Sequence, residues 1–101
     1  MNQVHIYFYS YGFHRTEFQE TFNLMFDFAD MGASFSDLKS IERVTSTIIR
    51  QIYFYKKHNI KDIYRIGIQC RNGLHRSVDI SEKLCIYFSK YFITDVFHYD
   101  F

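Results

Sequence analysis

The stretch from residue 61 to residue 91 constrains the fold more than any other part of the chain. "KDIYRIGIQC" has the apolar, β-branched character of a buried strand, and "SVDISEKLCIYFSKY" follows it after a short connection with apolar residues at helical spacing. A strand that is apolar along most of its length is typical of the centre of a sheet whose faces are covered. The sequence therefore predicts an α/β fold built around a central strand that ends at Cys70.

The rest of the chain supplies the other elements of a small sheet. "QVHIYFYSYGF", which stops at Gly12, and "TFNLMFDFA" predict two strands. Apolar residues recur at helical spacing from Asp37 to Lys57 or His58, and "ITDVFHYDF" predicts a last strand. The resulting order predicts a single α/β domain over residues 1–101, with about four strands and two main helices. The sheet and the helices form two or three layers, and a right-handed crossover joins the third and fourth strands.

Composition limits the function classes open to such a domain. With 48% hydrophobic residues, the 101-residue chain can form one core, and its net charge of +1 gives no overall attraction to polyanions. Cys70 and Cys85 are too few for a disulfide framework and lack Cys-x-x-Cys spacing, so we expect a cytoplasmic protein with reduced thiols. We expect no metal and no cofactor. The apolar runs fall short of the roughly 18 residues that span a membrane, so no membrane partner is expected.

Polar residues crowd together where the central strand turns into the helix. Residues 70–77 follow the pattern Cys-x-x-Gly-x-x-Arg-Ser. A short connection entering a helix turns backbone N–H groups inward, and the helix start adds its own N–H groups and dipole, so this place favours an anion. Gly73 lets an oxygen approach the main chain, Arg76 offers two parallel hydrogen bonds, and Ser77 adds a hydroxyl donor. The pattern predicts a strand-loop-helix turn that binds phosphate.

The predicted site extends beyond this turn to the end of the first strand, which parallel α/β sheets bring to the same edge. Each residue alone is typical of an ordinary turn, cap or surface position, and it is their combination after a buried strand that favours an anion site. The predicted phosphate-binding residues are Cys70, Arg71, Asn72, Gly73, Leu74, His75, Arg76 and Ser77, with Ser10, His14 and Arg15 from the first strand's end.

Residues 70–77 also resemble the Cys-x5-Arg-Ser/Thr motif of cysteine-dependent phosphatases, in which a thiolate attacks phosphorus. An acid must then protonate the leaving oxygen. The candidate acids are Asp27, Asp30, Asp95 and Asp100. Gln69 stands where these phosphatases usually carry histidine, so we expect Cys70 to be a small buried residue that closes the loop.

The closer resemblance is to the C-terminal domain of the bacterial RNase adapter protein RapZ, whose pattern resembles Cys-x-Gly-Gly-x-His-Arg-Ser-Val. Residues 66–88, which include "CRNGLHRSVDISEKLCIYF", are similar to it, and "YSYGF" and "LMFDFADMG" resemble two further segments, with Ala29 in place of the family's arginine. The resemblance implies a single RapZ C-terminal-like domain over residues 1–101 without the family's N-terminal nucleotide-binding domain. It also implies roles in binding an amino-sugar phosphate and small RNAs, and in self-association.

The leading hypothesis is an oligomeric, non-catalytic domain that binds a phosphorylated small molecule: a nucleotide, a sugar phosphate or a nucleotide-derived signal. Such a domain could act by sequestration, as a phage-encoded sponge does. One alternative is an RNA-binding adaptor, with Tyr7, Tyr9, Tyr11 and Phe13 stacking on bases. The other is a phosphatase with Cys70 as its nucleophile. More aromatic residues than one small core can cover predict a homo-oligomer.

Overall fold

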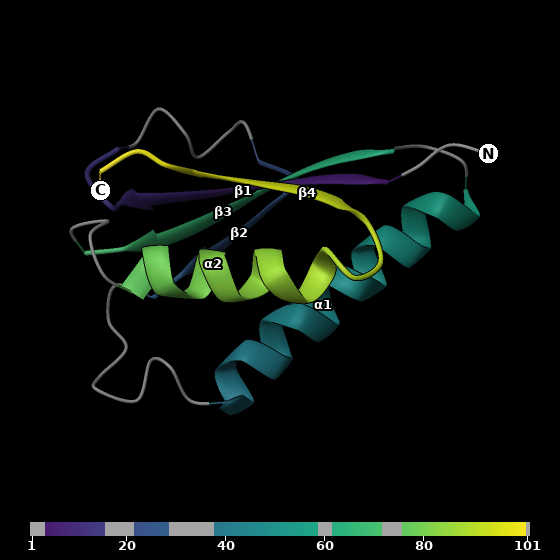
Figure 1. The fold of residues 1–101 in the computed structure, drawn as a ribbon, viewed down its shortest axis with the longest axis horizontal. Helices are drawn as coiled ribbons and strands as arrows, with labels where there is room; N and C mark the ends of the chain where they lie inside the picture. Colours follow the sequence, from purple (N-terminus) through teal and green to yellow (C-terminus); the bar gives the residue numbers. More distant parts are fainter. Residues whose placement is uncertain (1–3, 16–21, 29–37, 59–61, 72–75, 101) are drawn as a thin grey trace.

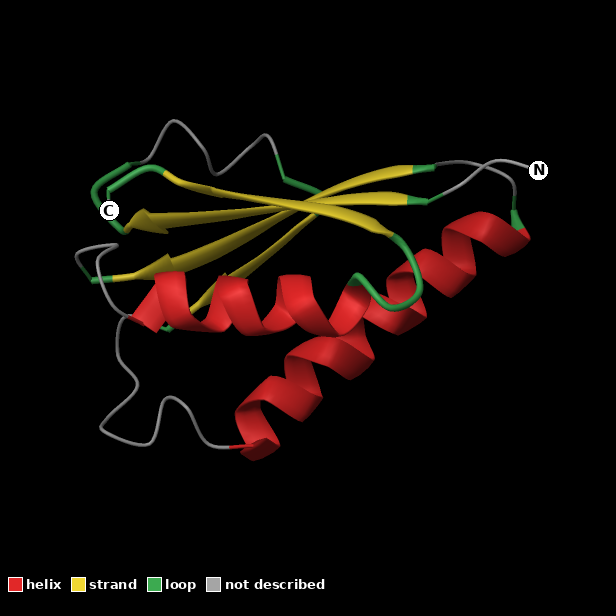
Figure 2. Cartoon of the chain, in the orientation of Figure 1, coloured by secondary structure: helices red, strands yellow, loops and turns green. Residues whose placement is uncertain are grey.

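Four strands and two helices make up the described part of the chain. The computed structural model describes residues 4–15, 22–28, 38–58, 62–71 and 76–100. The elements follow one another in the predicted order (Figures 1 and 2). Their bounds are β1 His5–Gly12, β2 Leu24–Asp27, α1 Leu38–Lys57, β3 Ile63–Cys70, α2 Arg76–Phe88 and β4 Ile93–His98.

All four strands run parallel in one sheet of order β2-β3-β1-β4. β1 lies between β3 and β4, with Gly12 opposite Cys70 and Ser10 opposite His98. β3 is an inner strand, as its apolar sequence predicts. Both helices lie on the same side of the sheet (Figure 2), so the predicted α/β fold is confirmed in its two-layer form.

The strand order explains why both helices share one side. The chain moves in the same direction across the sheet from β2 to β3 and from β3 to β4, and right-handed crossovers place both connections on one face. The move from β1 to β2 runs the opposite way across the sheet. Phe22, which precedes β2, lies on the face opposite the helices, with its ring centroid 5.4 Å from those of Tyr9 and Tyr11.

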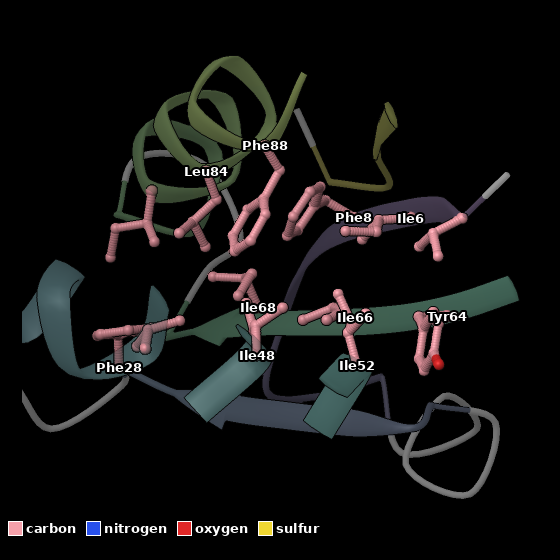
Figure 3. Packing of buried hydrophobic residues seen from close by; sticks show 13 residues of the cluster. Ile6, Phe8, Phe28, Ile48, Ile52, Tyr64, Ile66, Ile68, Leu84 and Phe88 are labelled. Atoms are coloured by element: carbon pink, nitrogen blue, oxygen red, sulfur yellow. The ribbon is translucent and has the colours of Figure 1, made fainter. Parts of the chain in front are cut away.

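The hydrophobic core fills the space between the sheet and the two helices (Figure 3). Every second residue of β1 and β3 points toward the helices, as Ile6 and Ile66 do. The rings of Phe8 and Phe88 lie 6.0 Å apart between β1 and α2. The buried cluster consists of Val4, Ile6, Phe8, Phe28, Val44, Ile48, Ile52, Tyr64, Ile66, Ile68, Ile80, Leu84 and Phe88.

The other side of the sheet carries the alternate residues, and no helix of the described ranges covers it. We call this surface the open face. Aromatic rings stack on one another along it: the ring centroid of Tyr9 lies 5.4 Å from that of Phe97 and 5.9 Å from that of Tyr99. The open face consists of His5, Tyr7, Tyr9, Tyr11, Phe22, Met25, Asp27, Ile63, Arg65, Gly67, Gln69, Ile93, Asp95, Phe97 and Tyr99.

Several elements end earlier than the sequence predicts. The second helix stops at Phe88 and not at Tyr91, because the N–H groups of Tyr91 and Phe92 turn back to the Phe88 carbonyl at 3.0 and 2.9 Å. The second strand is only the four residues of β2, and the last strand ends at His98. Among the described residues, neither helix combines the length and apolar character needed to cross a membrane.

Gly67 lies under the ring of Phe22. A Cβ at this position would lie 2.6 Å from Cδ2 and 2.7 Å from Cε2 of Phe22, closer than van der Waals contact allows. We expect Gly67→Ala to lower the free energy of unfolding by about 1 to 3 kcal/mol, the usual cost of overpacking, as measured by urea denaturation.

Phe22→Ala supplies the matched background for this test. Removing the ring makes room for the new methyl group, so Gly67→Ala should cost much less in that background. An equal cost in both backgrounds would contradict the contact.

Candidate anion-binding site at the carboxyl edge of the sheet

The carboxyl ends of all four strands meet at one edge of the sheet, because every strand pair is parallel. Backbone hydrogen bonds hold the segments that follow the strands. The N–H of Phe13 donates to the carbonyl of Cys70 at 2.9 Å, and the N–H of Phe28 donates to that of Gln69 at 2.7 Å. Ligands of parallel α/β sheets bind at this edge, so these bonds form the base of the candidate site.

Cys70 and the first turn of α2 lie together at the middle of this edge. The thiol of Cys70 donates to the hydroxyl oxygen of Ser77 at 3.2 Å, and both side chains are buried. The Nη1 of Arg76 donates to the carbonyl oxygen of Phe28 at 3.3 Å, which joins the start of α2 to the end of β2. The structure thus brings together Cys70, Arg76 and Ser77, three residues of the predicted site.

The remaining part of the predicted turn lies outside the described residues, as does the candidate acid Asp30. The undescribed turn residues are Asn72, Gly73, Leu74 and His75. Arg71, which directly follows β3, is exposed. Asp79, in the first turn of α2, pairs with Lys83 at 2.9 Å. Arg71, Arg76 and the helix dipole therefore give the start of α2 a positive character.

Ser10 belongs to a chain of hydrogen bonds that runs from the buried Ser10 hydroxyl to the exposed Glu82. Its hydroxyl bonds to Nδ1 of His98, whose Nε2 lies 2.7 Å from Oε1 of Glu82. A carboxylate only accepts, so Nε2 carries a proton, and in the neutral imidazole Nδ1 then accepts from the Ser10 hydroxyl. The chain joins β1, β4 and α2. It has the residue types of a catalytic triad, but Ser10 is 0% exposed and cannot reach a substrate, so we assign it a supporting role.

His14 and Arg15 face a carboxylate from the C-terminal segment. Asp100 accepts hydrogen bonds from the N–H of Gly12 at 2.7 Å and from Nε of Arg15 at 2.8 Å, and Nε2 of His14 lies 3.5 Å away. Partial burial alone would raise the pKa of Asp100. The hydrogen bonds from Gly12 and Arg15 and the nearby charges of Arg15 and His14 outweigh it and lower the pKa.

Asp100 therefore holds in place two residues predicted to contact the phosphate, His14 and Arg15. Sequence reasoning considered this aspartate only as an acid for a phosphatase and missed its role as their partner. The available signal is its position two residues after β4, because β4 and β1 end at the same edge.

Two candidate acids of the phosphatase hypothesis lie on the open face, away from Cys70. Asp95 pairs with His5 at 2.8 Å. Asp27 lies near Tyr11: burial of that ring, followed by the negative charge of Asp27, raises the pKa of Tyr11 to about 12. Cys70 belongs to the opposite, helix-facing set of β3 residues, so neither carboxylate is placed to protonate a group leaving its sulfur.

Comparison with known proteins assigns no function to this edge. The chain matches no model of a known protein family, and no characterised protein matches its sequence. The resemblance to the RapZ C-terminal domain therefore remains a hypothesis carried by its motifs.

Asp100→Asn tests the anchoring of the carboxyl edge. The pKa of Asp100 is lowered in the folded protein, so its contribution to stability is present at neutral pH and lost as the pH falls through the folded-state pKa. We expect the variant to unfold about 1 to 2 kcal/mol more easily at neutral pH, with the difference from wild type shrinking in acid, as followed by urea denaturation.

Asp62→Asn is the matched control, because Asp62 forms an exposed ion pair with Lys56 at 3.3 Å and such pairs contribute little. An Asp100→Asn effect that is absent at neutral pH, or equally large in acid, would show that the carboxylate does not anchor the edge.

Proposed function

We propose that the chain binds the phosphate group of a small molecule at the carboxyl edge, between the end of β3 and the start of α2, and releases it unchanged. The observation that carries this proposal is the position of Arg76. It is the first residue of α2, and its bond to the Phe28 carbonyl holds the guanidinium at the helix start. A guanidinium beside the N–H groups of a first helical turn suits a tetrahedral oxyanion.

The ligand class that fits this chemistry is a nucleotide, a sugar phosphate or a nucleotide-derived signal. Cys70 and Cys85 are free thiols in the structure, which supports a reducing compartment such as the cytoplasm. One role for a domain that binds without turnover is sequestration, as in a phage-encoded sponge for a host nucleotide signal. Native mass spectrometry of the protein as purified, followed by denaturation, would identify a retained phosphorylated compound.

Arg76→Ala tests the site directly, with inorganic phosphate and adenosine monophosphate as probes in isothermal titration calorimetry. Loss of the guanidinium should weaken the binding of both probes at least about tenfold, or roughly 1.4 kcal/mol. Arg76→Lys keeps the positive charge but cannot donate two parallel hydrogen bonds, so its affinity for the probes should fall between those of Arg76→Ala and wild type.

Arg50→Ala, on the exposed side of α1, is the matched control and should bind like wild type. The circular dichroism spectrum of Arg76→Ala should match that of wild type, because the change removes a partly buried polar contact and no core volume. Unchanged phosphate affinity in a folded Arg76→Ala variant would refute the proposed site.

One contact favours the phosphatase as a second candidate. Ser77 lies 3.2 Å from the Cys70 sulfur, where its hydroxyl could donate a hydrogen bond to a thiolate. Attack of that thiolate on phosphorus would break the bond to the leaving oxygen, which then needs a proton. The positions of Asp27 and Asp95 on the open face count against this second step.

Cys70→Ser distinguishes binding from hydrolysis. Under the binding proposal, wild type releases no phosphate from para-nitrophenyl phosphate or adenosine monophosphate, and Cys70→Ser binds the probes as wild type does. Cys85→Ser is the control for loss of a thiol. Repeated turnover by wild type that Cys70→Ser abolishes and Cys85→Ser retains would replace the binding proposal with the enzymatic one.

A further inference from the structure

The open face is a large surface that the proposed phosphate site does not use. Phe97 and Tyr99 are each 43% exposed, and Ile63 and Ile93 at the other end of the face are 48% and 45% exposed. Apolar side chains gathered on one side of a sheet, with no helix of the described ranges above them, are typical of an interaction surface.

A positive and a negative side chain lie on opposite sides of β1 on the open face. Strand register places Arg65, Tyr7 and Asp95 in one row across β3, β1 and β4. The guanidinium of Arg65 lies 5.8 Å from the centroid of the Tyr7 ring, and Asp95 pairs with His5. This row runs from a positive charge on one side of β1, across an aromatic ring, to a negative charge on the other side.

We propose that the open face binds the open face of a second copy of this chain, about a two-fold axis parallel to β1. Rotation about that axis exchanges the two sides of the sheet, so β3 of each copy lies across from β4 of the other. In the charged row, Arg65 of each copy then faces the partner's Asp95, and the two Tyr7 rings meet near the axis. The charge pattern is self-complementary for this axis.

The neighbouring rows are complementary in the same way. Toward the amino ends of the strands, Ile63 of one copy faces the partner's Ile93. Toward the carboxyl ends, Gly67 shares a row with Phe97, and the Phe22 ring lies above Gly67. The raised ring of Phe22 in one copy therefore faces the partner's Phe97. Apolar groups meet apolar groups on both sides of the charged row.

The size of the open face indicates how strong this association is. Strands rise about 3.3 Å per residue and lie about 4.8 Å apart, so strands of eight, four, eight and six residues cover roughly 400 Å² per copy. The total of about 800 Å² is below the size of stable specific interfaces and within the range of weak, transient ones. We therefore expect a dimer that dissociates on dilution.

A second copy fits this face better than RNA does. The charged residues of the open face, other than histidine, are Arg65, Asp27 and Asp95, which give no excess of positive charge for a phosphate backbone. Tyr11, one of the rings predicted to stack on bases, is 0% exposed. The face offers aromatic surface with no excess of positive charge, which suits a copy of itself.

Charge reversal at the two ends of the charged row tests the proposal by sedimentation equilibrium in phosphate-free buffer. Arg65→Asp alone and Asp95→Arg alone each bring like charges together twice per dimer, so each should weaken self-association at least about tenfold. An equimolar mixture of the two variants pairs opposite charges in both places, so it should form a heterodimer about as strong as the wild-type dimer.

Tyr53→Ser is the control, because Tyr53 is 72% exposed on α1, on the other side of the molecule, and it should associate like wild type. Both variant sites are exposed, and circular dichroism checks that each variant folds. The proposal is overturned if wild type stays monomeric at high micromolar concentration, if both single variants dimerise like wild type, or if the mixture associates no better than its components.

Binding of an oligouridine by a monomeric wild type, lost in Phe97→Ala, would assign the open face to RNA and would also overturn the proposal. None of these measurements depends on the phosphate site, so either proposal can fail while the other stands.

Discussion

The parallel pairing of β1 with β3 on one side and β4 on the other is the interaction on which the rest of the structure depends. Parallel neighbours require crossover connections, and the strand order sends α1 and α2 to one side of the sheet. The same pairing collects all the carboxyl ends at one edge. The candidate anion site and the open face are thus two consequences of a single arrangement of strands.

The element order follows from local sequence, whereas the strand order does not. The apolar run that ends at Cys70 predicts an inner strand because burial on both sides leaves its mark within a few residues. Which strands flank β1 is decided by contacts between distant segments, and no periodicity records them. The end of α2 is a local effect, because the turn after Phe88 closes on a carbonyl of the helix itself, but no glycine or proline marks it in the sequence.

Some contacts of the candidate site are also predictable from local sequence, and others depend on the strand order. Cys70 and Ser77 are seven residues apart, so a strand followed by a helix is enough to predict that they meet. Arg15 and Asp100 are 85 residues apart, and their bond becomes predictable only when β4 is known to lie beside β1. The motif therefore predicts the middle of the carboxyl edge, while the partners that fix its outer part come from the fold.

A two-fold axis parallel to β1 leaves the direction of the strands unchanged. Both copies in the proposed dimer therefore direct their carboxyl edges toward the same end, with the two sheets about 10 Å apart, the usual spacing of packed sheets. The helices, and with them the start of α2, lie on the outer sides of such a pair. Arg76 in each copy then remains accessible from outside, so dimer formation and phosphate binding do not compete for the same surface.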